Sequence, residues 1–285
     1  MVPALSQPPC LDRVEATRQS MDYQFCLRTH TGLMRHNNED SVLVDDATGL
    51  AVLADGMGGY NAGEVASTMT TSHVFRELAP WLAETGDRAL ARDLRRALEV
   101  CVYNANRAIL QAARLNSQYS GMGTTLVVGV VHSSRLVLGH IGDSRCYRWR
   151  DAVLTQLTRD HSLLQEQIDA GLLTPAQAAV SIHRNLVTRA LGVADPVMLS
   201  VAEHRVEPGD LFLMCSDGLS DMVSDRELSA ILALSGSMDD KADQLVERAN
   251  ANGGRDNISV VLIQAPQAPP ALGRRSLLSR LLNKQ

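Results

Sequence analysis

The sequence lacks the features that mark several specialised classes of protein. Its 285 residues contain no apolar run of membrane-spanning length, and no basic start followed by an apolar core that would indicate a signal peptide. The 27 Lys and Arg residues are outnumbered by 32 Asp and Glu, and the net charge of −5 argues against nucleic-acid binding, which needs a basic face. We therefore expect a cytoplasmic globular protein.

Cysteine is scarce and follows no pattern. The five cysteines are odd in number, have no Cys-x-x-Cys spacing and lie mostly inside apolar segments: Cys10, Cys26, Cys101, Cys146 and Cys215. This distribution is typical of reduced thiols in the core of a cytosolic protein. Because neither His nor Cys is clustered, zinc is disfavoured as a bound metal.

The length favours one large domain. With 45% hydrophobic and 21% charged residues, the chain can bury a sizeable core. We expect a leader at 1–20, a globular domain at 21–264 and a tail at 265–285. The tail has three prolines, four basic residues and no acid, and its leucines would share a helical face. A docking or membrane-surface helix and a frayed terminus both remain open for it.

Four acidic residues stand beside apolar runs. In the stretch 51–59 (AVLADGMGG) the apolar run stops at Asp55 and opens into glycines, which predicts a strand that delivers a carboxylate to a site. Gly56 leaves its own carbonyl uncrowded, so this carbonyl and Asp55 could face one hard cation. Asp143, Asp217 and Asp256 stand beside other apolar runs. One such acid is usually a turn residue or helix cap, but four favour a metal site.

The apolar periodicity predicts strands alternating with a few helices. Two amphipathic helices, over 62–82 and 88–115, should form an antiparallel pair that covers a sheet. The first should bury Val65, Met69, Ser72, Phe75 and Leu78. Two short helices, one over 163–171 and one from Thr174, begin a region to about 185 that we interpret as a flap over the site. Strands are expected over 23–27, 41–44, 51–54, 126–131, 136–141, 147–149, 153–157, 211–215 and 258–262, with a turn at 150–151, and further helices from 225 and over 239–250.

Carboxylates with backbone oxygen favour Mg²⁺ or Mn²⁺, because hard oxygen ligands match hard cations. Several carboxylates are too many for one Mg²⁺ that keeps most of its waters, so two ions sharing an Asp are expected. Such a pair can lower the pKa of a bridging water and clamp a phosphoryl group for in-line attack. Arg35 has the planar fork that holds phosphate oxygens. This pattern alone leaves phosphatase and nuclease open.

Six motifs in order give the sequence a resemblance to a known family. They are Arg35-x-x-x-Glu39-Asp40, 54–59 (ADGMGG), 121–125 (GMGTT), 142–145 (GDSR), 216–219 (SDGL) and Asp256-Asn257. From about 23 to 264 the chain resembles the metal-dependent protein phosphatases of the protein phosphatase 2C family, bacterial type. The resemblance implies an α+β fold, a sandwich of two antiparallel β-sheets flanked by antiparallel helix pairs. It also implies a serine/threonine phosphatase with Mn²⁺ or Mg²⁺.

The resemblance also implies roles for individual residues. Asp55 would bridge two ions, Gly56 would offer its carbonyl to one of them, and Asp217 and Asp256 would bind the other. Asp143 would bind a third ion together with Asp217. In addition, Glu39 and Asp40 would hold metal-bound waters, and Arg35 would hold the phosphate of a phosphoserine or phosphothreonine protein.

One departure from the family concerns the proton donor. Animal members carry His directly after the Asp-Gly pair, where this chain has Met57. A water on the third ion or His161 is a candidate for protonating the leaving oxygen. We expect a monomer that reverses a bacterial Ser/Thr kinase. The alternatives are a catalytically weak docking module of a kinase complex and a nuclease, the latter disfavoured by the acidic balance.

Overall fold

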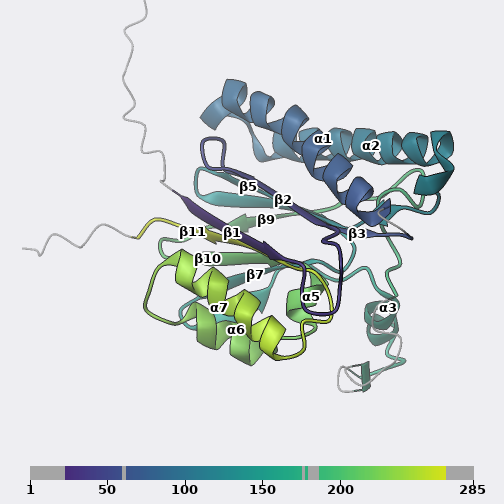
Figure 1. Ribbon diagram of the computed structural model, residues 1–285. Coiled ribbons are helices and arrows are strands. Elements are labelled where there is room, and N and C mark those ends of the chain that lie inside the picture. Colours follow the sequence, from purple (N-terminus) through teal and green to yellow (C-terminus); the bar gives the residue numbers. More distant parts are fainter. Residues whose placement is uncertain (1–22, 60–61, 175–176, 179–185, 268–285) are drawn as a thin grey trace, which may run out of the picture.

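Two antiparallel β-sheets packed face to face form the centre of the molecule (Figure 1). The computed structural model describes residues 23–59, 62–174, 177–178 and 186–267. One sheet has the order β1 (Gln24–His30), β11 (Ile258–Gln264), β10 (Leu211–Cys215), β7 (Arg145–Arg150), β8 (Val153–Gln156). The other has the order β2 (Asp40–Asp45), β3 (Leu50–Met57), β5 (Leu126–His132), β6 (Arg135–Ile141), β9 (Ser200–Arg205), and β4 (Gly123–Thr124) pairs with β3. The predicted α+β sandwich is confirmed.

The central strands are apolar on both faces because each sheet is covered on both sides. In β10, Phe212 and Met214 point into the layer between the sheets, whereas Leu211, Leu213 and Cys215 face the helices. The layer between the sheets also receives Leu53, Val127 and Val261, among others. This double burial explains why these strands appear in the sequence as continuous apolar runs rather than as alternating patterns.

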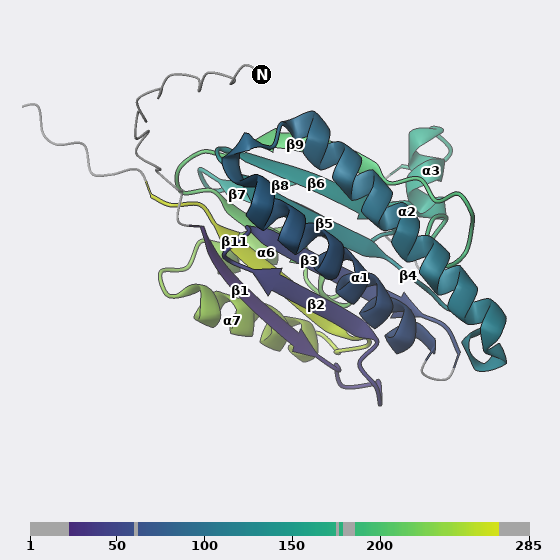
Figure 2. The same ribbon diagram turned by 90° about the horizontal axis from the view of Figure 1, so that it is seen from above.

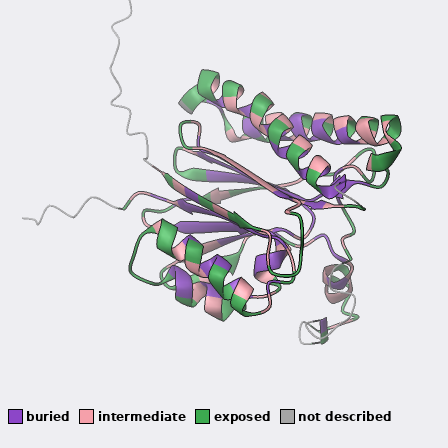
Figure 3. Ribbon diagram, viewed as in Figure 1, coloured by how far each residue is buried: buried purple, intermediate pink, exposed green. Residues whose placement is uncertain are grey.

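Helices cover the outer face of each sheet. The long antiparallel helices α1 (Ala62–Thr85) and α2 (Ala91–Leu115) cover the β2–β9 sheet and are joined by a short 3-10 turn at Gly86–Arg88 (Figure 2). The helices α6 (Asp225–Leu232) and α7 (Met238–Ala251) cover the other sheet, and their inward faces are buried (Figure 3). As the capping-box spacing predicts, Ser224 caps α6 and exchanges hydrogen bonds with Glu227.

The predicted buried face of α1 is correct for its apolar residues, which pack against the core, and wrong for Ser72. Ser72 is exposed, and Val65, Met69 and Phe75 are only partly buried, so Leu78 alone of the predicted set is fully buried. The helix also turns small and hydroxyl side chains to the sheet: Gly63, Ala66, Ser67, Thr70, Thr71 and Val74. Its threonines can be buried because their hydroxyls donate to carbonyls one turn earlier, at Ala66 and Ser67.

Two elements are absent from the sequence-based prediction. The edge strand β9 contains the polar and charged residues of SVAEHR and is largely exposed, so it lacks a strand signal. The helix α5 (Asp217–Ser220) is a single turn directly after β10. Both lie where tertiary pairing, rather than local pattern, decides the structure.

Only the first part of the predicted flap is described. Its helix α3 (Leu163–Asp169) is capped by Ser162 and stands apart from the sandwich (Figure 1). Most of the second short helix predicted from Thr174 lies outside the described residues, as do the leader, Cys10 and nearly all of the tail. The other four cysteines are buried and free. No helix among the described residues is long and apolar enough to cross a membrane.

The start of α1 lies directly against the end of β3. A Cβ atom at Gly63 would lie 2.8 Å from the carbonyl carbon of Gly56, and one at Gly56 would lie 2.1 Å from the carbonyl oxygen of Gly63. Two glycines are therefore required where the helix meets the strand that carries Asp55. Ser67 on the next turn donates to the carbonyl of Glu39 at 2.5 Å, which ties β2 to the same helix.

This contact predicts that replacing Gly63 destabilises the protein more than replacing Gly59. We expect Gly63→Ala to lower the free energy of unfolding by about 1–3 kcal/mol, because its Cβ would push two backbones apart. Gly59→Ala is the control, since a Cβ there would meet no atom within 4 Å. Urea unfolding of both variants without divalent metal measures the difference. Equal stability of the two variants would contradict the close approach.

Candidate metal centre

Five of the predicted acids converge at one end of the sandwich. Asp40 and Asp55 are directly paired across β2 and β3. Asp217 begins α5 at the end of β10, Asp143 lies in the turn between β6 and β7, and Asp256 lies in the turn before β11. Asp40 is buried and Asp55, Asp143 and Asp217 are half-buried, so the cluster is accessible from solvent.

The acids perturb one another electrostatically. Removal from water raises the pKa of Asp55 well above its ordinary value, and the charges of Asp40, Asp217, Asp143 and Asp256 raise it further. The pKa of Asp217 is also raised, first by burial and then mainly by Asp143. Burial raises the pKa of Asp143 to about 6. Like charges at such positions require a compensating cation or shared protons.

Asp40 shows most directly that a partner is needed. Its Oδ2 accepts a hydrogen bond from the Ser216 hydroxyl at 2.8 Å, but its buried Oδ1 has no hydrogen-bond partner within the described part of the chain. Burial raises the pKa of Asp40 to about 6. Buried polar atoms are normally satisfied by protein, water or an ion. The orphaned oxygen therefore fits a site built around a hydrated cation.

Arg35 and Glu39 lie beside the acids on the loop between β1 and β2. The Arg35 guanidinium is half exposed and bonds Asp256 at 2.6 Å. The pKa of Glu39 is raised by burial, while Arg35 opposes this increase. The backbone N–H of Gly56 donates to the carbonyl of Glu39, which places Glu39 next to Asp55. The predicted ligand role of the Gly56 carbonyl remains a prediction.

Asn257 connects the loop to the acids, a function that the sequence analysis did not assign. Its side-chain oxygen accepts from the N–H of Glu39 at 2.8 Å, and its amide donates to the carbonyls of Thr31 and Asn37. One buried side chain thus fixes both ends of the segment that carries Arg35. The only signal in the sequence was its position directly after Asp256.

Hydroxyl groups support the backbone beneath Asp55. The N–H of Asp55 donates to the Thr125 hydroxyl at 3.0 Å, and this hydroxyl lies 2.7 Å from that of Ser144, next to Asp143. The Thr124 hydroxyl donates to the Asp55 carbonyl. The motif at 121–125 therefore acts as a support for the acids, not as a phosphate cradle.

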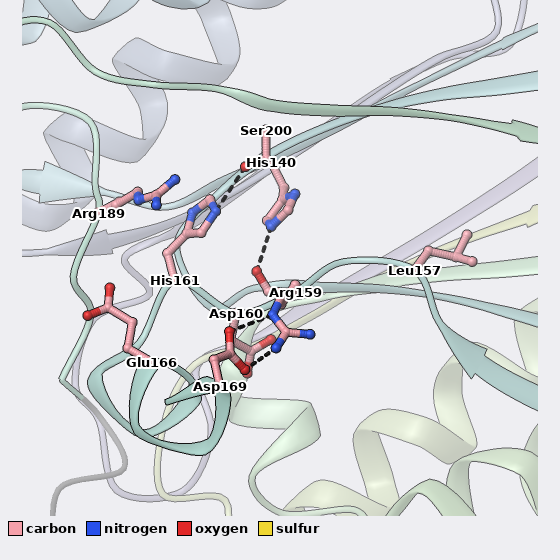
Figure 4. Close-up of a pocket in the computed structure, with 9 residues that line it drawn as sticks. All are labelled: His140, Leu157, Arg159, Asp160, His161, Glu166, Asp169, Arg189 and Ser200. Atoms are coloured by element: carbon pink, nitrogen blue, oxygen red, sulfur yellow. Dashed lines mark hydrogen bonds and ion pairs between the residues drawn. The ribbon is translucent and has the colours of Figure 1, made fainter. Parts of the chain in front are cut away.

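Both ring nitrogens of His161 have hydrogen-bond partners within the protein. Its Nδ1 accepts from the N–H of Gly142, so its proton is on Nε2, which lies 3.0 Å from the Ser200 hydroxyl (Figure 4). It stacks on His140 at 4.6 Å, and burial lowers its pKa to about 4. A neutral imidazole with a hydrogen bond at each ring nitrogen supports the turn that carries Asp143. These contacts do not support His161 as the group that protonates the leaving oxygen, and that role stays a prediction.

Asp160, the residue before His161, holds the other end of the turn that carries Asp143. Asp160 accepts hydrogen bonds from the Arg145 guanidinium, the shortest at 2.7 Å. Asp160 and His161 line a cavity of about 310 Å³ beside α3, together with Arg159, Glu166 and Arg189 (Figure 4). Asp143 is therefore held from both sides by consecutive residues of the cavity wall.

The acids are spread around the site and do not form a closed cage. Among the described residues, no three His, Cys, Asp or Glu side chains are grouped tightly enough to enclose an ion. Mg²⁺ keeps several waters and usually takes only one or two carboxylates from a protein. The donors present, all oxygen, therefore fit hydrated Mg²⁺ or Mn²⁺ better than zinc.

Comparison with known proteins agrees with this geometry. Residues 33–262 match the sequence profile of the family described as protein phosphatase 2C. The chain belongs to this family. It is 36% identical over 240 residues to the serine/threonine phosphatase stp of Listeria innocua, covering 83% of this chain and 94% of that protein.

Solved structures of family members have the same fold. The serine/threonine phosphatase PstP/Ppp of Mycobacterium tuberculosis is similar with a TM-score of 0.79 and 37% identity, over 86% of this chain and 99% of that one. The catalytic domain of PstP in complex with two manganese ions has a TM-score of 0.75 and 38% identity, over 86% and 99% of the chains. The predicted family resemblance is confirmed.

The connecting role of Asn257 predicts a loss of order in one loop. We expect Asn257→Ala to lower the free energy of unfolding by about 2–3 kcal/mol, because it leaves buried backbone groups unsatisfied. Hydrogen exchange should increase at the amides of 33–39. Asn252→Ala is the control, since the side chain of Asn252 bonds the Met222 carbonyl and Glu227 at the exposed surface. Unchanged exchange at Glu39 in Asn257→Ala would contradict the assignment.

The environment of His161 predicts an unusually acidic titration. Its lowered pKa means that the folded state keeps the ring neutral while the unfolded state takes up a proton from about pH 6.5 downward. Its contribution to stability is therefore complete above pH 6.5 and is lost as the pH falls toward 4. NMR titration of the His161 Hε1 resonance should give a midpoint near 4. A midpoint at or above 6 would refute the buried, neutral assignment.

Proposed function

We propose that this chain hydrolyses phosphoserine and phosphothreonine in proteins with the help of two divalent cations, Mn²⁺ or Mg²⁺. The observation that carries the proposal is the convergence of Asp40, Asp55, Asp217 and Asp256, of which only Asp256 is paired with a cationic side chain, that of Arg35, among the described residues. Family membership and the relatives named serine/threonine phosphatases support it. The two manganese ions in the PstP catalytic domain support the metal requirement.

The donor set suggests which residues would hold the ions. Asp55 would contact both, with the Gly56 carbonyl on one and Asp217 and Asp256 on the other. Glu39 and Asp40 would order coordinated waters, consistent with the unsatisfied Oδ1 of Asp40. Asp143, whose charge acts on Asp217, would hold a third ion with it. Bound ions supply Lewis acidity, which lowers the pKa of a coordinated water and neutralises phosphate charge.

Arg35 would bind and orient the phosphate. Its guanidinium is fixed on one side by Asp256 at 2.6 Å, and half of its surface remains open to solvent. An arginine held in this way offers its remaining N–H groups in a planar fork that matches phosphate oxygens. Asn257 fixes the backbone on either side of it, so the phosphate position is preorganised relative to Asp55.

Two further proposals concern the surroundings of the reaction. Because His161 is neutral and bonded on both ring nitrogens, the leaving oxygen would take its proton from water rather than from this side chain. The phosphoproteins would be products of a bacterial Ser/Thr kinase in the cytoplasm. A purely docking role is disfavoured, since every acid of the motifs and Arg35 is present.

Loss of Asp217 should abolish turnover. We expect hydrolysis of p-nitrophenyl phosphate and of a phosphothreonine peptide to require added Mn²⁺ or Mg²⁺ and to stop with EDTA. Asp217→Ala should lower kcat/KM by more than about 100-fold, since even partners of metal ligands contribute 10–100-fold. Asp239→Asn, which removes a surface partner of Arg28, is the control. Full activity in EDTA would exclude the proposed function.

A further inference from the structure

Two large apolar side chains are exposed directly before Arg35. Leu33 is 63% and Met34 is 70% accessible to solvent. Neither belongs to the clusters of buried apolar side chains nor packs against them. A single exposed leucine needs no explanation, because folded proteins expose much apolar surface. Two adjacent ones beside a phosphate-binding group form a local apolar patch at the rim of the site.

The backbone beneath this patch is fixed. The N–H groups of Leu33 and Met34 both donate to the carbonyl of Gly254, at 2.7 and 3.2 Å. A Cβ at Gly254 would lie 2.8 Å from the Leu33 Cγ, so the two segments are in close contact. The loop projects from the ends of β1 and β2 (Figure 2). The side chains of Leu33 and Met34 are therefore exposed although hydrogen bonds hold their backbone in place.

The patch and the phosphate-binding group share one support. Gly254 holds the backbone of Leu33 and Met34, and Asp256, two residues later, holds the Arg35 guanidinium. Neighbouring Cα atoms are 3.8 Å apart along a chain, so residues 33 and 34 lie within one or two residue lengths of Arg35. In a peptide whose phosphate is bound by Arg35, the residues next to the phosphorylated one would lie within reach of Leu33 and Met34.

We propose that Leu33 and Met34 form a specificity subsite that favours phosphoproteins with a large apolar side chain next to the phosphorylated residue. The inference rests on the proposed function and adds a substrate class to it. Contact would remove apolar surface of both partners from water, which is favourable in proportion to the area covered. The selection is independent of the metal centre, since neither side chain reaches the acids through any hydrogen bond.

Phosphothreonine peptides of one length test the proposal. One has glycine on both sides of the phosphothreonine, and the others carry leucine one or two positions before or after it. We expect the best leucine peptide to exceed the glycine peptide about fivefold to tenfold in kcat/KM, because an open surface recovers only part of a leucine's full transfer free energy. Leu33→Gln with Met34→Gln should bring this ratio to about one.

A matched control and a second variant keep the result interpretable. Val153→Gln changes a side chain that is 60% exposed on the β7–β8 hairpin. Val153 is paired with the last residue of β7, whereas Asp143 precedes the first, so this variant should keep the wild-type ratio. Should the double variant be too weak to assay, Met34→Gln alone must lower the ratio. No leucine preference in the wild type, or a ratio that survives both variants, overturns the subsite. No hydrolysis of any peptide with Mn²⁺ present would instead overturn the proposed function.

Discussion

The main constraint on the structure is the electrostatic repulsion between the carboxylates gathered at one end of the sandwich. Two unit charges 4 Å apart repel by about 4 kcal/mol at the effective dielectric of a protein surface. Burial, with neighbouring carboxylates adding to it, raises the pKa of Asp40 and of Asp143 to about 6. A carboxyl group with a folded pKa above its unfolded value lowers stability as the pH rises through that interval, here about 4 to 6. At neutral pH the cluster is therefore destabilising until a cation binds, which links metal binding to folding stability.

Apart from the Arg35–Asp256 ion pair, the fold supports these acids with neutral groups rather than with opposing charges. Hydroxyls at Ser216 and Thr125 and the amide of Asn257 position the carboxylates and the adjacent backbone. The nearby Arg145 is paired with Asp160, and its charge offsets the raised pKa of Asp143 only in part. Neutral donors fix geometry without competing for the place of a metal ion. The negative potential that attracts a cation is thereby preserved while the side chains stay in position.

The sequence predicted the acids and most strands because both depend on local pattern, whereas the sandwich was implied by the family resemblance. A continuous apolar run marks a strand buried on two faces, and the residue at its end marks the site, as for Asp55 and Asp217. The sequence could not predict contacts between distant segments. Asn257 bonds Thr31, 226 positions away, and α1 buries hydroxyls that the apolar pattern did not indicate. The role of His161 likewise depends on Gly142 and Ser200, which only the folded chain brings to it.

The two sides of the acid cluster are held differently. Asp40 and Asp55 belong to paired strands within a sheet, so their relative position follows from the ladder itself. Asp143 instead lies in a turn whose flanking residues are held by Asp160 and His161, directly before α3. The end of α3 returns to this segment through the Asp169–Arg159 ion pair. A displacement of α3 would therefore reach Asp143 through the Asp169–Arg159 and Asp160–Arg145 ion pairs and the hydrogen bonds between His161 and Gly142, a path that does not include the Asp40–Asp55 pair. The pairing of β2 with β3 therefore fixes the positions of Asp40 and Asp55. The position of Asp143 depends instead on the contacts of the segment that follows β8.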